Sequence, residues 1–464
     1  MKKMFLMIML AAFVQSINAQ TIIHVFDNLT FFDGYAATVA TPVPPTGVIR
    51  HRNDLYARKL TSDELASIGD TLHMKVTVKA DCDNYDRIGN VNIALVTPGS
   101  TTYNPDAVQR IEIGRYITPF MNKNYSPTSV PYDYTIDNVA YLLKDTSITN
   151  HYDIWIELEL FGVPYAANTQ VAGCAGRNDV FYGSLDFTTN SASPIENNNV
   201  LMPLAFKQNF NNYEATATDT LGKTTRSISF TLEQDLTDAA FFLITSNHGA
   251  NSGGEEYNRR NHYVYFDDAL ELTYKPGRNT CEPFRVYNTQ GNGIYGSSTM
   301  SNAQWQSFSN WCPGDVIDIR KISLGAVSAG THKFTIRVPQ AVFAGGQGNI
   351  PLSVYLHGKT SGTLTAPVTP PFTPPVTPPV DTLSTGALNI YPVPAGSYLT
   401  VAPNSEPVQA LSLIDILGHI VYLNDKISGK TIINTSLLSR GVYILKISLP
   451  TQTITRKILV VGTN

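Results

Sequence analysis

In residues 20–190 of this 464-residue chain, polar side chains are densest in the segment Cys82-Asp-Asn-Tyr-Asp-Arg87. The segment lies between two stretches with strand character, and loops between strands readily expose functional groups. Carboxylates held beside an arginine could position a water molecule and transfer a proton, as a general acid or base does. The simpler interpretation of a carboxylate next to an arginine is a surface ion pair, which contributes little.

Two more groups of acidic side chains follow along the chain. Glu157 and Glu159 share one face of a predicted strand, because residues i and i+2 of a strand point the same way. Such a pair of like charges normally faces solvent. The run 247–264 joins a glycine-rich loop, where a backbone can approach a ligand closely, to five charged or ionisable side chains: Glu255, Glu256, Arg259, Arg260 and His262. This run carries no metal-binding motif.

The composition excludes two classes of protein. Hydrophobic residues make up 43% of the chain, which excludes disorder of the whole chain. The 33 basic and 37 acidic side chains leave a net charge of -4, so no positive surface for nucleic acid is expected. Charged residues make up only 15%, so the polar surface must come largely from Asn, Thr, Ser and Tyr, as in many secreted β-rich proteins.

Residues 1–19 have the pattern of a signal peptide. Lys2 and Lys3 precede an apolar stretch from Phe5 to Val14, and cleavage is predicted near Ala19. About ten apolar residues are too few to span a bilayer, which needs about 20, and no other stretch approaches that length. In an exported chain, four remaining cysteines indicate two disulfides in one of three connectivities: Cys82, Cys174, Cys281 and Cys312.

The elements that must position these side chains are predicted to be strands. Segments with apolar residues at every second position recur through residues 20–364, and helical periodicity is sparse. Two β-sandwiches in tandem fit this length, at 20–190 and 191–364. A proline-rich run within 365–383 cannot join a sheet and predicts an extended linker before a small domain at 384–464.

That small domain resembles the C-terminal sorting domain of the type IX secretion system. The motifs occur in the order seen in that family: Ile390-Tyr-Pro-Val-Pro-Ala395, Leu399-Thr-Val401, Leu413-Ile-Asp-Ile-Leu-Gly418 and Leu437-Leu-Ser-Arg-Gly-Val-Tyr-Ile-Leu-Lys-Ile447. The resemblance implies a small β-sandwich, export through the periplasm by the type IX machinery, and a final location at the cell surface or in the medium. A β-domain that binds carbohydrate is the alternative.

Residues 70–320 resemble the bacterial peptide-N-glycosidase F family, whose fold is two adjacent jelly-roll sandwiches with the active site at their interface. The resemblance rests on a collinear series of motifs: Cys82-Asp-x-x-Asp-Arg87, Glu112-Ile-Gly-Arg-Tyr-Ile-Thr-Pro119, Glu157, Tyr182-Gly-Ser-Leu-Asp186, Gly-x-x-Glu256-x-x-x-Arg260-x-His262 and Trp311-Cys-Pro-Gly314. The expected fold class is therefore all-β, with two tandem jelly rolls and the small C-terminal sandwich.

The resemblance implies hydrolysis of the amide that joins N-acetylglucosamine to an asparagine side chain in N-linked glycopeptides. Asp86 would be the principal catalytic carboxylate, and Glu256 and Glu157 would assist it. Arg87 and Arg260 would orient the sugar or the carboxylates. Two carboxyl groups in unlike environments can divide the roles of acid and base that amide cleavage needs. No cofactor or metal is expected, and a monomer is expected.

The resemblance also implies the disulfides, because the family pairs a cysteine near Cys281 with the one in Trp-Cys-Pro-Gly. This gives Cys281–Cys312 and leaves Cys82–Cys174.

Several positions depart from the family pattern. His248 and Glu159 stand at substrate-facing positions where the family has tryptophans, so the surface on which the sugar stacks is altered. Gly254 and Asn258 replace two cysteines that flank the second-domain glutamate, and Ser307 and Phe308 stand where an arginine is expected.

Because of these departures, two other functions are considered. One is a glycan-binding or surface-interaction protein without catalytic activity on the same fold. The other is a glycoside hydrolase, which also uses two carboxylates.

Overall fold

A computed structural model describes most of the chain. The described residues of the large N-terminal part are 20–190, 197–210, 224–249, 254–307, 310–343 and 348–368. Those of the C-terminal part are 388–391, 398–403, 407–415, 419–425, 429–435, 438, 441–450 and 453–460. The predicted signal peptide and most of the predicted linker lie outside them.

The chain divides into two compact units, Met1–Phe372 and Thr373–Asn464. The finer domain limits drawn from the sequence stay predictions.

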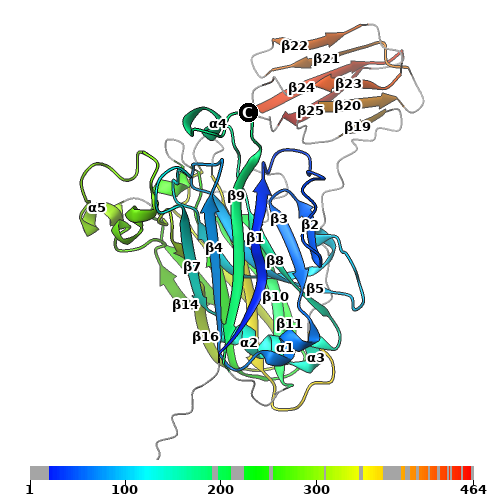
Figure 1. Ribbon diagram of the computed structural model, residues 1–464. Coiled ribbons are helices and arrows are strands. Elements are labelled where there is room, and N and C mark those ends of the chain that lie inside the picture. Colours follow the sequence, from blue (N-terminus) through cyan, green and yellow to red (C-terminus); the bar gives the residue numbers. More distant parts are fainter. Residues whose placement is uncertain are drawn as a thin grey trace, which may run out of the picture. The chain divides into compact units, whose positions relative to one another are not determined.

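The first sandwich of the large unit consists of two antiparallel sheets (Figure 1). The strands of one sheet are, in spatial order, β1 (Thr21–Phe32), β9 (Asp179–Thr189), β4 (Leu72–Ala80) and β7 (Ser129–Thr135). The other sheet consists of β15 (Val316–Ile317), β6 (Gln109–Ile117), β5 (Ile88–Val96), β8 (Asp153–Leu160), β3 (Leu55–Lys59) and β2 (Val48–Arg52). In β4 every second side chain is buried, as the period-two pattern predicts.

The second sandwich also has two antiparallel sheets. One contains β10 (Asn199–Phe210), β18 (Ile350–Lys359), β12 (Leu236–Thr245) and β16 (Arg320–Val327). The other contains β11 (Thr225–Leu232), β17 (Gly330–Arg337), β13 (His262–Phe266) and β14 (Ala269–Tyr274). Its core is aromatic at the centre, where Phe241 packs edge to face against Phe334 and Phe266.

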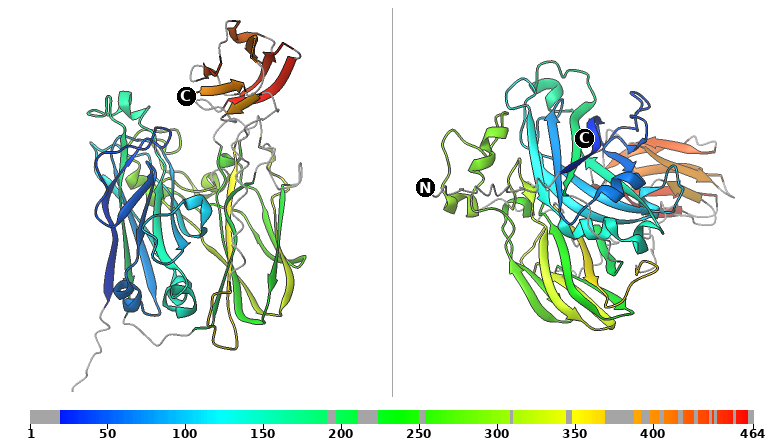
Figure 2. Two further views of the ribbon diagram at one scale, coloured as in Figure 1. Left: turned by 90° about the vertical axis from the view of Figure 1, so that its right-hand side faces the viewer. Right: turned by 60° about the horizontal axis from the view of Figure 1, so that its bottom comes forward.

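The two sandwiches lie side by side within this unit (Figure 2). Strand β6 of the first sandwich packs against β10, β18 and β12 of the second. Strand β15, which comes from the sequence of the second sandwich, pairs with β6 and so extends a sheet of the first. The interface is therefore built from the strands themselves as well as from loops.

Within the described residues, helices are few and short. They are α1 (Ser62–Ser67), α2 (Asp137–Lys144), α3 (Thr146–Thr149), α4 (Ala167–Gln170) and α5 (Asn302–Ser307), with short 3₁₀ segments at η1 (Pro105–Ala107), η2 (Glu255–Tyr257) and η3 (Glu282–Tyr287). Among the described residues, no helix has the length and hydropathy needed to span a membrane.

The small unit has its own two sheets and its own core. One sheet contains β19 (Leu388–Tyr391), β20 (Tyr398–Pro403) and β23 (Thr431–Asn434); the other contains β22 (Ile420–Asn424), β21 (Ala410–Ile414), β24 (Gly441–Ser448) and β25 (Thr453–Val460). Leu399, Leu413 and Leu445 are fully buried between them. The prediction of an all-β fold is confirmed in both units.

Two disulfides brace the loops of the large unit. Cys82 is bonded to Cys174 and Cys281 to Cys312, with Cα atoms 5.4 and 5.3 Å apart, which is the pairing that the resemblance implied. The first disulfide anchors the polar segment between β4 and β5. The second closes the base of the segment that contains η3 and α5.

Candidate active site

A cavity of about 450 Å³ opens where the two sandwiches meet. The first sandwich supplies one side of its lining: Tyr85, Asp86, Arg87, Ile88, Ile117, Phe120 and Phe161. The second supplies the other side: His248, Glu256, Tyr257 and Trp311. Four of the seven site residues predicted from the sequence are therefore brought together here: Asp86, Arg87, His248 and Glu256.

The loop between β4 and β5 places Asp86 in this cavity, and its neighbour Asp83 holds the loop in shape. The Asp83 carboxylate is fully buried and accepts hydrogen bonds from Arg87 Nε at 2.6 Å and from the backbone N–H groups of Val163 and Tyr85 at 2.7 and 3.0 Å. The two aspartates of the motif thus have different structural roles. Asp83 builds the loop, and Asp86 is left facing the cavity.

The turn η2 places Glu256, and Glu255 holds this turn. The buried Glu255 carboxylate pairs with Arg260 Nε at 3.0 Å and accepts a hydrogen bond from the backbone N–H of Val342 at 2.8 Å. Asn310 Nδ2 donates to the backbone carbonyl of Glu256 at 2.6 Å. The Glu256 carboxylate accepts from the backbone N–H of Gly249 at 3.2 Å.

The environment raises the pKa of both cavity carboxyl groups. Burial, followed by repulsion from the Glu256 carboxylate, raises the pKa of Asp86 from 3.8 to about 7, although the Arg87 guanidinium acts in the opposite direction. Burial also raises the pKa of Glu256, while hydrogen bonds from Tyr257 and Gly249 act to lower it. At neutral pH, Asp86 can therefore both accept and donate a proton.

His248 is a neutral member of the cavity. Burial and the nearby Arg115 guanidinium lower the pKa of His248 to about 3. Its Nε2 lies 2.7 Å from the Ser246 hydroxyl, which accepts a hydrogen bond from Arg115 Nη1 at 2.8 Å. The imidazole is thus held in place and uncharged at any pH at which the fold is expected to work.

Aromatic rings surround the carboxyl groups, which the sequence analysis did not foresee. Tyr85, Phe120, Phe161, Tyr257 and Trp311 all line the cavity. Trp311 is fixed by a hydrogen bond from its indole N–H to the backbone carbonyl of Asn247 at 2.8 Å. Aromatic residues other than those at positions 159 and 248 therefore line the cavity. Tyr85 and Tyr257 adjoin Asp86 and Glu256 in sequence, and this adjacency could have predicted that both rings lie near the carboxyl groups.

Three predicted site residues do not line this cavity. Glu157 is fully buried on β8, where Tyr103 and Asn92 donate to its carboxylate at 2.8 and 3.0 Å. Glu159 forms ion pairs with Arg52 and Lys207, and their charges hold its pKa below the usual range despite its burial. Arg260 is engaged by Glu255. Their assigned catalytic or binding roles stay predictions.

One group of metal-ligand side-chain types lies close together in the described part of the chain: Asp81, Cys82 and Asp179. The Cys82 sulfur is bonded to Cys174, and the Asp81 carboxylate forms ion pairs with Lys123 at 3.1 Å and Arg177 at 2.9 Å. Lys123 and Arg177 thus balance the negative charge of Asp81 without a metal ion.

The pKa of Asp86 leads to a prediction about stability. The folded protein binds the Asp86 proton more tightly than the unfolded chain does, so stability should fall as pH rises from 3.8 to about 7. Asp86→Asn removes this penalty. At about pH 8 the free energy of unfolding of the variant should therefore exceed that of the wild type by up to a few kcal/mol, at about 1.4 kcal/mol per pKa unit, and its melting temperature should be higher. Calorimetry should find little difference at about pH 4, and a variant less stable at about pH 8 would contradict the raised pKa.

Comparisons with protein families cover most of the chain. Residues 22–175 match the model described as peptide-N-glycosidase F, N terminal, and residues 213–357 match peptide-N-glycosidase F, C terminal. Residues 389–461 match the secretion system C-terminal sorting domain. This tail directs the protein to the type IX secretion system and so to the cell surface or the extracellular space. No curated protein sequence matches the chain.

Solved structures share the fold of the large unit at low sequence identity. Two crystal forms of PNGF-II match 74% of this chain at 22% identity, with TM-scores of 0.53 and 0.52, and 66% and 65% of their own length is covered. The chain thus spans just under two thirds of PNGF-II. A crystal structure of a peptide-N(4)-(N-acetyl-beta-D-glucosaminyl) asparagine amidase matches at 15% identity and a TM-score of 0.50, covering 75% of this chain and 99% of that one.

Proposed function

The chain belongs to the peptide-N-glycosidase F family, and from this membership we propose that it is an exported amidase that acts on N-linked glycopeptides and glycoproteins. The bond broken would be the amide between N-acetylglucosamine and the asparagine side chain. The products would be an aspartyl peptide and a glycosylamine, which loses ammonia in water. One observation is the main support for the proposal: Asp86 and Glu256, which come from different sandwiches, line the same aromatic cavity.

Amide hydrolysis suits the electrostatics of this cavity. A general base works best when its pKa lies near the working pH, and burial raises the pKa of Asp86 to about 7. Asp86 would take a proton from the water that attacks the side-chain carbonyl carbon. It would then return the proton to the departing nitrogen, so that one group serves as base and then as acid.

The other cavity residues would hold the substrate and assist. Glu256 lines the cavity opposite Asp86 and would orient the attacking water or a sugar hydroxyl. Arg87 lines the cavity beside Asp86 and would orient the sugar, while Trp311 and Tyr85 offer ring faces to it. His248, neutral and fixed by Ser246, can hydrogen bond without adding charge.

Product analysis of a digested glycopeptide tests this proposal. An amidase converts the glycosylated asparagine to aspartate, a glycoside hydrolase leaves a sugar on the asparagine, and a binding protein leaves the glycopeptide unchanged. A peptide that retains N-acetylglucosamine after complete digestion would overturn the amidase assignment.

Glu256 and Glu159 allow a matched comparison, because both carboxylates are shielded from bulk solvent and only Glu256 lines the cavity. Glu256→Gln should lower the turnover rate by about 10²-fold, a typical contribution of a group that assists proton transfer. Glu159→Gln should leave turnover nearly unchanged and instead lower stability by about 1–3 kcal/mol, since Arg52 and Lys207 lose a charged partner. Steady-state kinetics and urea unfolding measure the two effects. The reverse pattern would move the site toward β8.

Glu157→Gln tests the remaining predicted acid. Its carboxylate is engaged by Tyr103 and Asn92 outside the cavity lining, so the substitution should affect stability more than turnover. A loss of turnover as large as that of Glu256→Gln would instead support the role of assisting acid.

A further inference from the structure

A second cavity of about 430 Å³ adjoins the first, a volume within the range of about 300–1,000 Å³ that is usual for ligand sites. The two cavities share three lining residues, Tyr85, Phe120 and Tyr257. A ligand seated in the catalytic cavity could therefore extend into the second one past these rings.

Among the described residues that line the second cavity, none has a charged side chain. Besides the three shared aromatic residues, it is lined by four side-chain amides, two glycines and an isoleucine: Asn84, Gln170, Gln290, Asn292, Gly291, Gly293 and Ile294. An amide group both donates and accepts hydrogen bonds, as a sugar hydroxyl does. The catalytic cavity, by contrast, is lined by Asp86, Arg87 and Glu256.

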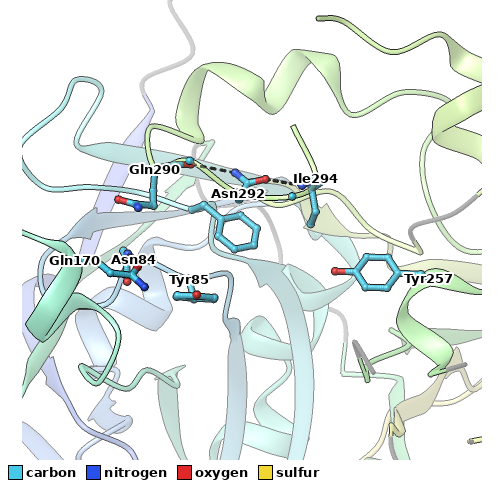
Figure 3. A pocket seen from close by; sticks show the side chains of 10 residues that line it. Asn84, Tyr85, Gln170, Tyr257, Gln290, Asn292 and Ile294 are labelled. Carbon is cyan, nitrogen blue, oxygen red and sulfur yellow. Dashed lines mark hydrogen bonds between the residues drawn. The ribbon is translucent and has the colours of Figure 1, made fainter. Parts of the chain in front are cut away.

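One wall presents an unused acceptor. Asn84 is fully buried, and its Nδ2 donates to Gln170 Oε1 at 2.7 Å. Its Oδ1 is buried and has no hydrogen-bond partner. Figure 3 shows Asn84 and Gln170 side by side, with the ring of Tyr85 next to them. Tyr85 is 38% exposed, and its ring offers a face for the apolar side of a sugar.

The opposite wall is held in shape before any ligand arrives. The backbone N–H of Gln290 donates to the carbonyl of Phe120 at 2.8 Å, and its side-chain oxygen accepts from Asn122 at 3.1 Å. The Asn292 side chain accepts from the backbone N–H of Ile294 at 2.8 Å. Figure 3 shows Gln290 and Asn292 on one side of the cavity and Tyr257 on another, with the tyrosine hydroxyl directed toward the cavity.

We propose that this second cavity is a subsite for an uncharged sugar residue of the glycan that lies beyond the core N-acetylglucosamine disaccharide. A phosphate, a sialic acid carboxylate or a charged peptide side chain would find no counter-charge among the described lining residues, whereas a neutral sugar can use the amides and the tyrosine ring together. The inference rests on the proposed function for the position of the reacting sugar. The binding experiment below does not depend on cleavage.

Two glycines give a matched pair of variants. A side chain at Gly293 would meet no atom within 4 Å at its Cβ, and Gly293 lines the cavity, so Gly293→Trp should fill the subsite without disturbing the loop. A side chain at Gly296 would be equally unhindered at its Cβ, and Gly296 is outside the lining, so Gly296→Trp is the control.

The test compares two glycopeptide substrates with the same peptide. One carries the core N-acetylglucosamine disaccharide, and the other carries a branched high-mannose glycan. Gly293→Trp should raise KM for the branched glycan by about tenfold, the loss expected for one or two hydrogen bonds to uncharged groups, and leave kcat and the KM for the disaccharide unchanged. Gly296→Trp should behave as the wild type. An equal change for both substrates, or no change for the branched glycan, would overturn the subsite.

Titration calorimetry with the free high-mannose oligosaccharide separates the two proposals. If no glycopeptide is cleaved but the oligosaccharide binds and Gly293→Trp weakens binding by about tenfold, the amidase assignment fails and the subsite stands. If glycopeptides are cleaved and Gly293→Trp binds the oligosaccharide as tightly as the wild type, the subsite fails and the amidase assignment stands. Failure of the wild type to bind the oligosaccharide also overturns the subsite.

Discussion

Asp86→Asn is expected to lower the turnover rate on a glycopeptide by about 10²- to 10⁴-fold, the usual contribution of general acid–base catalysis. This corresponds to about 3–5 kcal/mol of barrier at about 1.36 kcal/mol per decade. Asparagine keeps the shape of the side chain but cannot take a proton from water. Because the aromatic lining and Arg87 remain, the affinity for the glycopeptide should be largely retained.

The pH profile provides a second readout for the same variant. In the wild type, kcat/KM should change near the pKa of Asp86, which burial and Glu256 raise to about 7. If ionised Asp86 is the base, kcat/KM rises with pH through this value, and the rise should vanish in Asp86→Asn. A variant that keeps more than about a tenth of wild-type turnover would exclude Asp86 as the group that handles the proton.

The largest expected effect on stability comes from replacing Arg115, which forms hydrogen bonds between the two sandwiches. Its guanidinium is buried, pairs with both oxygens of Glu112 at 2.7 Å, and donates to Ser246 and to the Pro351 carbonyl of the second sandwich at 2.8 Å. Arg115→Met would leave the Glu112 carboxylate buried without a counter-charge. Such a loss destabilises proteins by about 3–5 kcal/mol.

The midpoint of urea unfolding measures this effect, and two further variants serve as a surface control and as a rescue. Lys333→Met removes an ion pair with Asp268 at the surface and should change stability by about 1 kcal/mol or less. Combining Arg115→Met with Glu112→Gln should recover part of the loss, because no charge is then left buried. If Arg115→Met is no more destabilising than Lys333→Met, the interface does not depend on this pair.

Much of the fold could be predicted from sequence because its signals are local. Alternating apolar residues in β4 predict a half-buried strand wherever the strand lies, and a run of prolines excludes a sheet. The order of strands within the sheets is not a local property. That β15 leaves the second sandwich to pair with β6 of the first depends on long-range contacts that no short pattern records.

The candidate site was predictable where a motif places residues close together in sequence. Asp86 and Arg87 reach the cavity together because one disulfide-anchored loop carries both. Arg260 could not be assigned in this way, since its actual partner is Glu255, the buried neighbour of the cavity glutamate. The environment of Glu159 likewise depends on Lys207, which the fold brings from a strand of the other sandwich.

The central claim is that water attacks the side-chain carbonyl carbon of the glycosylated asparagine, and the fate of the water oxygen tests it most directly. A glycopeptide is digested in water enriched in heavy oxygen, and the peptide and sugar are analysed by mass spectrometry immediately after cleavage. We expect one heavy oxygen atom in the new aspartate side chain and none in the freshly released glycosylamine. A peptide that ends as unlabelled asparagine, with the heavy oxygen on the sugar, would show that the carbon–nitrogen bond to the sugar ring was cleaved instead and would contradict the amidase assignment.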